Sequence, residues 1–454
     1  MKLILGAGLS GLAASYHLGH ANCRILERGH RAYGHIASVT RGGFMWDEGP
    51  HVSFTKHDYV KQLFADSVGQ QFNEFATIVG NYFRGCWITH PAQVSLHQVP
   101  EPLRSQCVDS FLKTRRGAGT AADKPADFQE WLDRAFGPIF AENLPAVYTR
   151  KYWTRNPREL TADWIGERVH MPSVDDVLRG ARGPLGKNAH YITKVRYPTR
   201  GGYQAFATKL RNEANIHFGS RIATVDLIGR RVILENGLEH TYTQLISTIP
   251  LPEFLRLLPS LPATVAAARE ALCCTELMVI NVTARHPTRR PETWFYVYDE
   301  DLLSTRINFT ERLSPHNAPP QTTGIQVEVY GSRFRPFAGD VTALTRQVVN
   351  ELSAMGLIDG PDCVDAHAVH IPWGNVVFDH DAKPALEVIW SWLEQFGLSR
   401  ESEDTHPLTN WAEGARRSTS AGPLAFAGRY AQWKYFWTDD CVLRGQQLAE
   451  NLSC

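Results

Sequence analysis

Three glycines near the N-terminus have the spacing of a dinucleotide-binding turn. Gly6, Gly8 and Gly11 separate an apolar stretch at residues 2–5 from a helical pattern at residues 12–19. In such a turn the first glycine permits the bend, and the second lets the backbone approach a pyrophosphate at the helix N-terminus. The third lets helix and strand pack closely. The pattern therefore predicts a bound dinucleotide.

An acidic residue follows at the expected distance. Residues 23–26 have the composition of a second strand, and Glu27 ends it. A carboxylate at this place accepts hydrogen bonds from ribose hydroxyls. NAD and FAD sites share this fingerprint, so these residues alone leave the choice between them open.

The next forty residues resemble the FAD-binding opening of one superfamily. It contains the amine oxidases, protoporphyrinogen oxidase, phytoene desaturases and UDP-galactopyranose mutase. The resemblance implies FAD as the cofactor. It assigns to the cofactor, besides Ser10 in the turn, these residues: Arg28, Gly34, Ser38, Gly49 and His51. His35 departs from the pattern, because the superfamily has a second glycine there.

Two later segments also resemble cofactor-binding parts of the superfamily. Residues 219–222 are similar to a strand whose backbone touches the adenine side, which implies a contact at Ile222, although an ordinary strand start has the same pattern. Near the C-terminus, Gly428 and Arg429 precede Thr438, Asp439 and a helical pattern at residues 442–452. The resemblance implies a second flavin segment there, whose helix N-terminus faces the cofactor. A helix that only packs on the core is the alternative.

Within the superfamily, the sequence is most similar to UDP-galactopyranose mutase, in blocks spread over most of the chain. The matching blocks are Gly49-Pro50-His51, residues 148–153 with 157–160, Tyr197-Pro198 with 201–203, and Thr305-Arg306-Ile307 with Glu328 and Tyr330. The resemblance implies a redox-neutral pyranose–furanose isomerisation of a nucleotide sugar through N5 of the reduced flavin. An external electron donor such as NAD(P)H would then reduce the flavin.

The mutase resemblance gives roles to individual side chains. The arginines suited to bidentate binding of a diphosphate are Arg168, Arg306 and Arg429. The expected catalytic residues are His51, Arg306, Arg429 and Tyr435. The expected substrate-binding residues are Trp153, Arg168, Glu328 and Tyr330, with Tyr330 and Tyr435 offering hydroxyls. Each has a structural alternative: Arg168 as a solvated helix-end residue, and Trp153 and His51 as core residues.

The sequence also departs from the mutases. A second arginine usually follows four residues after the position of Arg168, and this chain has Pro172 there. Tyr152 stands in place of the mutase glutamine, and Trp433 and Trp437 replace smaller or acidic residues. The substrate is therefore left open between another nucleotide sugar and a different molecule.

Four other function classes are alternatives to a mutase. An FAD-dependent oxidoreductase that removes hydride from a small molecule is the main alternative, although the amine-oxidase lysine near flavin N5 has no counterpart between Lys209 and Lys383. A non-catalytic FAD-stabilised scaffold is the second. Metal sites and Ser-His-Asp hydrolysis lack their motifs, since His367 and His370 lie on a strand pattern that points them apart and no Gly-x-Ser-x-Gly occurs.

The composition limits partners and location. The 454 residues carry 47 Lys and Arg against 47 Asp and Glu, so no net charge attracts nucleic acid. The eight cysteines form no Cys-x-x-Cys pair, which favours reduced thiols and a cytoplasmic protein. No apolar run approaches the roughly 20 residues of a membrane span. A small-molecule substrate remains as the expected partner.

The elements that position these residues predict an α/β fold. We expect a discontinuous Rossmann-like FAD-binding domain with inserted helical and antiparallel-sheet substrate regions. The expected division is 1–75, 191–250 and 401–454 for the FAD-binding domain, 76–190 for the helical region and 251–400 for the sheet region.

Local patterns add four expectations. Residues 325–329 alternate as a strand with one face toward a core and one toward a cleft. Residues 231–234 and 238–247 suggest a hairpin through a type I′ turn at Asn236-Gly237. Asp127 is expected to cap a helix at residues 128–136, and the polar residues 111–125 to form a loop.

Overall fold

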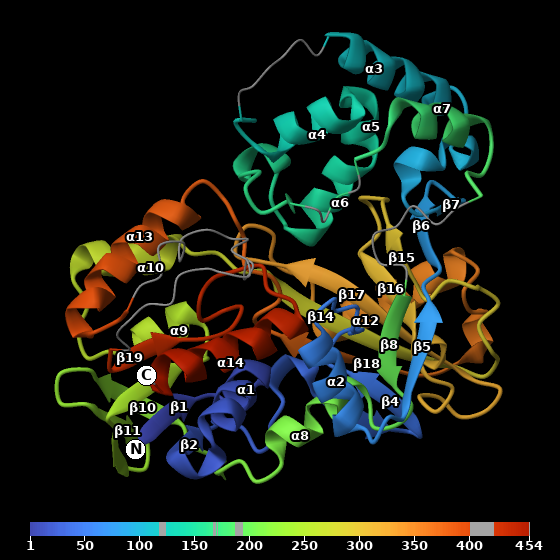
Figure 1. The fold of residues 1–454 in the computed structure, drawn as a ribbon. Coiled ribbons are helices and arrows are strands. Elements are labelled where there is room, and N and C mark those ends of the chain that lie inside the picture. The colour runs from blue at the N-terminus through green and yellow to red at the C-terminus, as the bar shows by residue number, and fades with distance from the viewer. Residues whose placement is uncertain (118–123, 167–168, 170, 187–193, 400–421, 454) are drawn as a thin grey trace.

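The computed structural model describes residues 1–117, 124–166, 169, 171–186, 194–399 and 422–453 (Figure 1). Among these, no helix has the length and apolar character needed to cross a membrane. The expected α/β class is confirmed, because a parallel sheet with helices is joined to mostly antiparallel sheets and a helical region.

A five-stranded parallel sheet lies on the side of the molecule where both ends of the chain are found (Figure 1). Its strands, in spatial order, are β19 (Leu424–Phe426), β13 (Gln244–Ser247), β1 (Lys2–Leu5), β2 (Cys23–Leu26) and β9 (Ile216–His217). Every neighbouring pair is parallel. Segments that are hundreds of residues apart therefore build one sheet, as a discontinuous nucleotide-binding fold requires.

Two helices pack closely beside this sheet. They are α1 (Leu9–Leu18) and α14 (Thr438–Ser453). Both begin earlier than the sequence patterns indicated. A Cβ added at Gly445 of α14 would lie 2.7 Å from the Cβ of Ala13, so only glycine allows this approach.

The expected hairpin is only partly present. β11 (Arg231–Leu234) pairs antiparallel with β12 (Glu239–Thr241) and with β10 (Ile222–Asp226). The prediction was wrong for residues 244–247, which form β13 and run parallel to β1 instead. The type I′ turn was also wrong, because Gly237 has φ +82° while Asn236 is not among the residues with positive φ. A type I turn followed by a glycine bulge explains this geometry.

A seven-stranded sheet forms the second layer. In spatial order its strands are β18 (Cys363–Ile371), β14 (Glu276–Ala284), β17 (Thr323–Gly331), β16 (Arg306–Phe309), β15 (Trp294–Val297), β6 (Val79–Phe83) and β7 (Cys86–Thr89). One face is apolar and packs with α12 (Val341–Ala354). The opposite face carries the polar residues of the alternating strands, as predicted for residues 325–329.

Five helices form a separate layer, seen at the top of Figure 1. They are α3 (Leu103–Gly117), α4 (Phe128–Phe136), α5 (Pro138–Asn143), α6 (Pro145–Tyr152) and α7 (Val174–Arg182). The prediction of a loop was wrong for residues 111–117, which continue α3. Cys107 and Phe111, four residues apart, bury one face of α3, while its basic residues had made the segment look like a loop.

The remaining elements are two small two-stranded sheets and further helices. They are β3 (Ser38–Arg41), β4 (Phe44–Asp47), α2 (Asp58–Ser67), β5 (Phe72–Ala76), β8 (Lys194–Pro198), α8 (Thr208–Arg211), α9 (Leu251–Arg256), α10 (Ala263–Ala271), α11 (Thr310–Leu313) and α13 (Ala382–Leu393).

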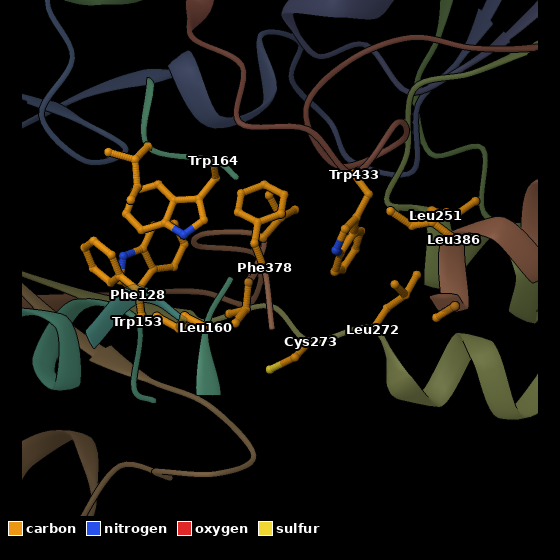
Figure 2. Close-up of a cluster of buried hydrophobic side chains, with 14 of the residues drawn as sticks. Phe128, Trp153, Leu160, Trp164, Leu251, Leu272, Cys273, Phe378, Leu386 and Trp433 are labelled. Atoms are coloured by element: carbon orange, nitrogen blue, oxygen red, sulfur yellow. The ribbon is translucent and has the colours of Figure 1, made fainter. Parts of the chain in front are cut away.

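A continuous apolar core joins the layers (Figure 2). Trp153 and Trp164 lie beside Phe128 of the helical region, and Trp433 lies among leucines of α9 and α13. Trp433 is 1 % exposed, so this departure from the mutase pattern fills core volume.

Replacing Asp127 with alanine is expected to lower the free energy of unfolding by about 1 kcal/mol. The Asp127 carboxylate caps α4 by accepting a hydrogen bond of 2.8 Å from the backbone N–H of Glu130, which confirms the predicted cap. Chemical denaturation measures the effect. The Asp127→Asn variant keeps the acceptor and should resemble the wild type, whereas an alanine variant of unchanged stability would contradict the role of the cap.

Candidate active site

One large cavity lies where the parallel sheet, the polar face of the seven-stranded sheet and the helical region meet. Its volume is about 960 Å³. The cavity is lined by all the residues expected to bind the cofactor, bind the substrate or take part in catalysis, except Gly11, Ser38 and Arg168. Arg168 lies outside the described residues.

The glycine turn forms one end of the cavity. Helix α1 begins after Gly8 and has no side-chain cap, so its first backbone N–H groups are available to an anion. Gly11 faces away from the cavity, and a Cβ there would lie 2.1 Å from the carbonyl oxygen of Gly6. This contact agrees with the packing role expected for the third glycine.

Glu27 is held rigidly at the end of β2. Its carboxylate accepts hydrogen bonds from the backbone N–H groups of Ala7 (2.9 Å) and Gly29 (2.7 Å). The contact with Ala7 ties the carboxylate to the glycine turn, and the contact with Gly29 ties it to the loop after β2. A carboxylate has further lone pairs, so the expected hydrogen bonds to ribose remain compatible with this arrangement.

His35 fits without the second glycine of the superfamily. The positive φ angles of this loop are at Tyr33 (+82°) and Gly34 (+54°), and His35 is not among the residues with positive φ. Its Nδ1 lies 3.0 Å from the carboxylate of Glu48, which also binds Arg31. His35 therefore needs no glycine-like backbone conformation, and its side chain adds a contact with Glu48.

Ser38 does not line the cavity but contacts Asp47 behind the cavity wall. Its hydroxyl donates to Asp47 at 2.6 Å, and Asp47 also accepts from the hydroxyl of Tyr197 and the backbone N–H of Tyr203. Gln326 of β17 donates to the Asp47 carbonyl at 2.9 Å. Burial raises the pKa of Asp47 to about 6, against these stabilising hydrogen bonds. The network fixes the loop that carries Gly49 and His51.

His51 is a neutral histidine at this loop. Its Nδ1 is 2.8 Å from the carbonyl of Gly49, which can only accept, so Nδ1 carries the proton and Nε2 is left as an acceptor. Burial lowers the pKa of His51 to about 4, and the hydrogen bond to Gly49 opposes this only in part.

The stability of the FAD-free protein should reveal this His51 pKa. Between pH 6.5 and about 4 the unfolded chain binds more protons at His51 than the folded chain, so the free energy of unfolding falls as the pH falls. From pH 7.5 to 5.0, wild type is expected to lose on the order of 1–2 kcal/mol more than His51→Gln. Urea titrations at both pH values measure this, and equal losses would contradict the shifted pKa.

The polar face of the seven-stranded sheet forms the wall opposite the glycine turn. Its register places Tyr296, Arg306 and Glu328 side by side on one face. Arg306 binds Glu328 in a bidentate pair, with distances of 2.8 and 2.5 Å, and the Tyr330 hydroxyl donates to the same carboxylate at 2.9 Å. Glu328 therefore neutralises the charge of Arg306 in this structure, and the expected role of Arg306 as a diphosphate ligand stays a prediction.

Arg429 has a different environment. Its Nη2 donates to the side-chain oxygen of Asn375 at 2.7 Å, and its guanidinium lies 4.8 Å from the ring centre of Tyr435. Within the described part of the chain, Arg429 forms no ion pair and its buried Nε has no hydrogen-bond partner. A cation at a cavity, with no carboxylate partner among the described residues, is suited to binding an anion.

The other expected substrate residues lie nearby. The Tyr435 and Tyr152 hydroxyls are 3.4 Å apart. Trp153 contributes to the cavity wall but is only 4 % exposed, packed against Trp164 and Phe378 (Figure 2), which supports its alternative as a core residue.

Two cavity residues were missed from the sequence. Asn308 is 1 % exposed, and both polar atoms of its side chain lack a partner among the described residues. Its position two residues after Arg306 on an alternating strand was a usable signal. Asn375 had no such signal, because the fold alone brings it to Arg429.

A group outside the cavity has metal-ligand residue types that the sequence analysis did not identify. The ligand atoms of His286, Asp359 and Asp362 lie within 4.8 Å of one another. His286 is 2.9 Å from Asp362, and Arg289 is 3.3 Å from Asp359.

Comparisons with known proteins identify the family. The model of the flavin containing amine oxidoreductases matches residues 9–453. The chain belongs to this family. The expectation of FAD as its cofactor is thereby confirmed.

Solved structures of several activities share this fold. A structure of reduced UDP-galactopyranose mutase is 22 % identical, with a TM-score of 0.86 over all of this chain and 95 % of that one. A putrescine oxidase bound to putrescine is 14 % identical, with a TM-score of 0.61 over 100 % and 98 % of the two chains. A CLA-producing fatty acid isomerase from P. acnes is 13 % identical, also with a TM-score of 0.61 over 100 % and 98 %. At these identities the likeness concerns the fold.

The residues of this family member suit FAD. The uncapped start of α1, the open space at Gly8 and the fixed Glu27 match a pyrophosphate and a ribose. At the start of α14, Thr438 and Asp439 also line the cavity. Gly428 has φ +108°, and a Cβ there would lie 2.4 Å from Ser10 Oγ, so the two flavin segments meet closely.

Proposed function

We propose that this flavoprotein is a redox-neutral, mutase-like isomerase of a nucleotide sugar. The observation that carries the proposal is the guanidinium of Arg429, whose Nε is buried, which has no carboxylate partner among the described residues and which lines the cavity of the flavin segments. A diphosphate offers the charge and the bidentate oxygens that such a guanidinium binds. The overall likeness to a reduced UDP-galactopyranose mutase supports the same choice.

The side chains around Arg429 suit such a substrate. We assign Arg429 to the diphosphate, with the hydroxyls of Tyr435 and Tyr330 as further donors. Arg306 positions Glu328 through their bidentate pair. The tyrosines of α6 and β15 close the cavity with aromatic rings, which excludes water around the sugar.

Bound FAD, once reduced, supplies the nucleophilic and electron-rich centre that none of these side chains provides. An isomerase of this kind consumes no reductant in each turnover. We propose an external donor such as NAD(P)H for the initial reduction.

The deciding experiment is anaerobic reduction of the purified holoprotein with dithionite, followed by incubation with UDP- and dTDP-sugars. We expect a chromatographically distinct isomer with the reduced protein only, without net consumption of reductant. Bleaching of the oxidised flavin by a substrate, without isomer, would contradict the proposal.

That contrary result would support an FAD-dependent oxidoreductase, the second candidate. The family itself and the similarity to putrescine oxidase favour it. The cavity argues against the amine-oxidase version, since no lysine lines it in the part of the chain that the structure describes.

A further inference from the structure

Asn375 is mounted firmly beside the flavin segments. It follows β18 in a short bridge to the residues before β14, where its backbone N–H donates to Thr275 Oγ1 and its carbonyl accepts from the Thr275 N–H, both at 2.8 Å. The neighbouring Gly374 N–H donates to the Thr275 carbonyl at 2.6 Å. The residue is 5 % exposed and lines the cavity. The backbone that carries the Asn375 side chain is therefore held in a fixed position.

The Asn375 side-chain oxygen is directed at the cation. It accepts from Arg429 Nη2 at 2.7 Å and lies 3.3 Å from the Tyr152 hydroxyl. The Tyr152 hydroxyl in turn lies 3.4 Å from that of Tyr435. Asn375 thus connects the arginine to the tyrosine that replaces the mutase glutamine.

The other described groups that face the Arg429 guanidinium are uncharged side chains. Those described nearest to its guanidinium are Tyr152, Tyr430, Tyr435 and Cys274. Burial raises the pKa of the Cys274 thiol well above its usual range and that of Tyr152 likewise, so both stay neutral at pH 7. The other arginine of the cavity, Arg306, shows the contrast, because Glu328 neutralises it.

We propose that Asn375 determines the specificity of this cavity for an anionic ligand, by orienting Arg429 with a neutral amide. Asparagine provides the same acceptor oxygen as aspartate but no charge. The guanidinium is held in place while its charge remains for the ligand. This inference rests on the proposed function in one respect, that the anion is the diphosphate of the substrate.

Two substitutions of Asn375 distinguish an effect of charge from an effect of the lost hydrogen bond. Asn375→Asp keeps the side-chain volume and the hydrogen bond to Arg429, and it forms a buried ion pair that competes with the ligand anion. Asn375→Ala removes the hydrogen bond but leaves the charge of Arg429 available. A purely structural role predicts that alanine is the more harmful change, whereas the proposed role predicts that aspartate is.

The test measures dissociation constants of inorganic pyrophosphate and UDP by the change they cause in the flavin absorbance of each holoprotein. We expect about 50-fold or weaker binding of both in Asn375→Asp and about 10-fold weaker binding in Asn375→Ala. Asn236→Asp, which adds the same charge in the exposed β11–β12 turn, should bind like the wild type. Flavin content and thermal unfolding show that each variant is folded.

The outcomes distinguish this inference from the proposed function. Equal pyrophosphate binding by wild type and Asn375→Asp, or a larger loss in Asn375→Ala than in Asn375→Asp, overturns the role of Asn375. Pyrophosphate binding by the wild type without isomerisation of any UDP- or dTDP-sugar overturns the proposed function alone. If Asn375→Asp does not retain FAD, the pyrophosphate affinities of Asn375→Ala and Asn375→Ser are compared instead. Serine offers a shorter acceptor without charge, so Asn375→Ser should bind pyrophosphate at least as tightly as Asn375→Ala. Weaker binding by Asn375→Ser overturns the inference.

Discussion

Replacing Arg429 with glutamine is expected to weaken binding of UDP to the holoprotein by about 100-fold or more, and to lower kcat/KM for a nucleotide sugar at least as much. Loss of a buried charged hydrogen-bond partner costs about 2–5 kcal/mol, and each 1.4 kcal/mol corresponds to a factor of ten. Glutamine keeps a polar side chain that can still donate to Asn375, so the loss reports the charge. Isothermal titration with UDP and initial rates with the reduced protein measure both quantities.

The control for Arg429 is an arginine outside the cavity. Arg231 lies on the exposed three-stranded sheet and is paired with Asp226 and Glu239. Arg231→Gln should bind UDP as the wild type does. Arg429→Lys should recover only part of the affinity, because an ammonium group does not offer the planar pair of donors. If Arg429→Gln bound UDP as tightly as Arg231→Gln, the diphosphate would have to lie elsewhere.

The cofactor half of the site could be predicted from the sequence because its determinants are local. The spacing of Gly6, Gly8 and Gly11 reports a strand, a turn and a helix that are adjacent in the chain. The same holds for Gly428 and the start of α14, where a strand end passes into a helix. In the cavity these two segments meet, with Gly428 against Ser10.

The substrate half depended on register between distant strands. Glu328 neutralises Arg306 because β16 and β17 pair with these residues opposite each other. Tyr296, another cavity residue, is opposite Arg306 on β15. A block resemblance identified Arg306 and Glu328 but not their pairing, which depends on the register of the two strands.

Two errors in the fold had similar causes. The strand at Gln244–Ser247 looked like the second half of a hairpin because it follows an Asn-Gly turn, yet its apolar residues are needed between β1 and β19 of the parallel sheet. In α3, Arg115 lies over the ring of Phe111 and donates to the carbonyl of Ala135, so a basic side chain covers the apolar face. Tertiary contacts decided both segments.

The second large effect is expected for Gly8→Ala, which should weaken FAD binding by about 100-fold or more while leaving the fold intact. Gly8 has an ordinary backbone conformation, φ −72° and ψ 178°, and an added Cβ would meet only the Cα of Gly34, at 3.8 Å. The methyl group would instead project into the space where the pyrophosphate must approach the backbone. Fluorescence titration of the apoprotein with FAD measures the affinity, and thermal unfolding of the apoprotein measures the fold.

Two other glycine variants serve as controls for Gly8→Ala. Gly360→Ala adds a methyl group where no atom lies within 4 Å, so FAD affinity and apoprotein stability should both stay unchanged. Gly11→Ala places a Cβ 2.1 Å from the Gly6 carbonyl oxygen, so it should destabilise the apoprotein itself. A Gly8→Ala protein that binds FAD normally would contradict pyrophosphate binding at this turn. If the Gly8→Ala apoprotein were as unstable as Gly11→Ala, Gly8 would serve packing. A glycine that only makes room for FAD can gain a methyl group without lowering the stability of the apoprotein.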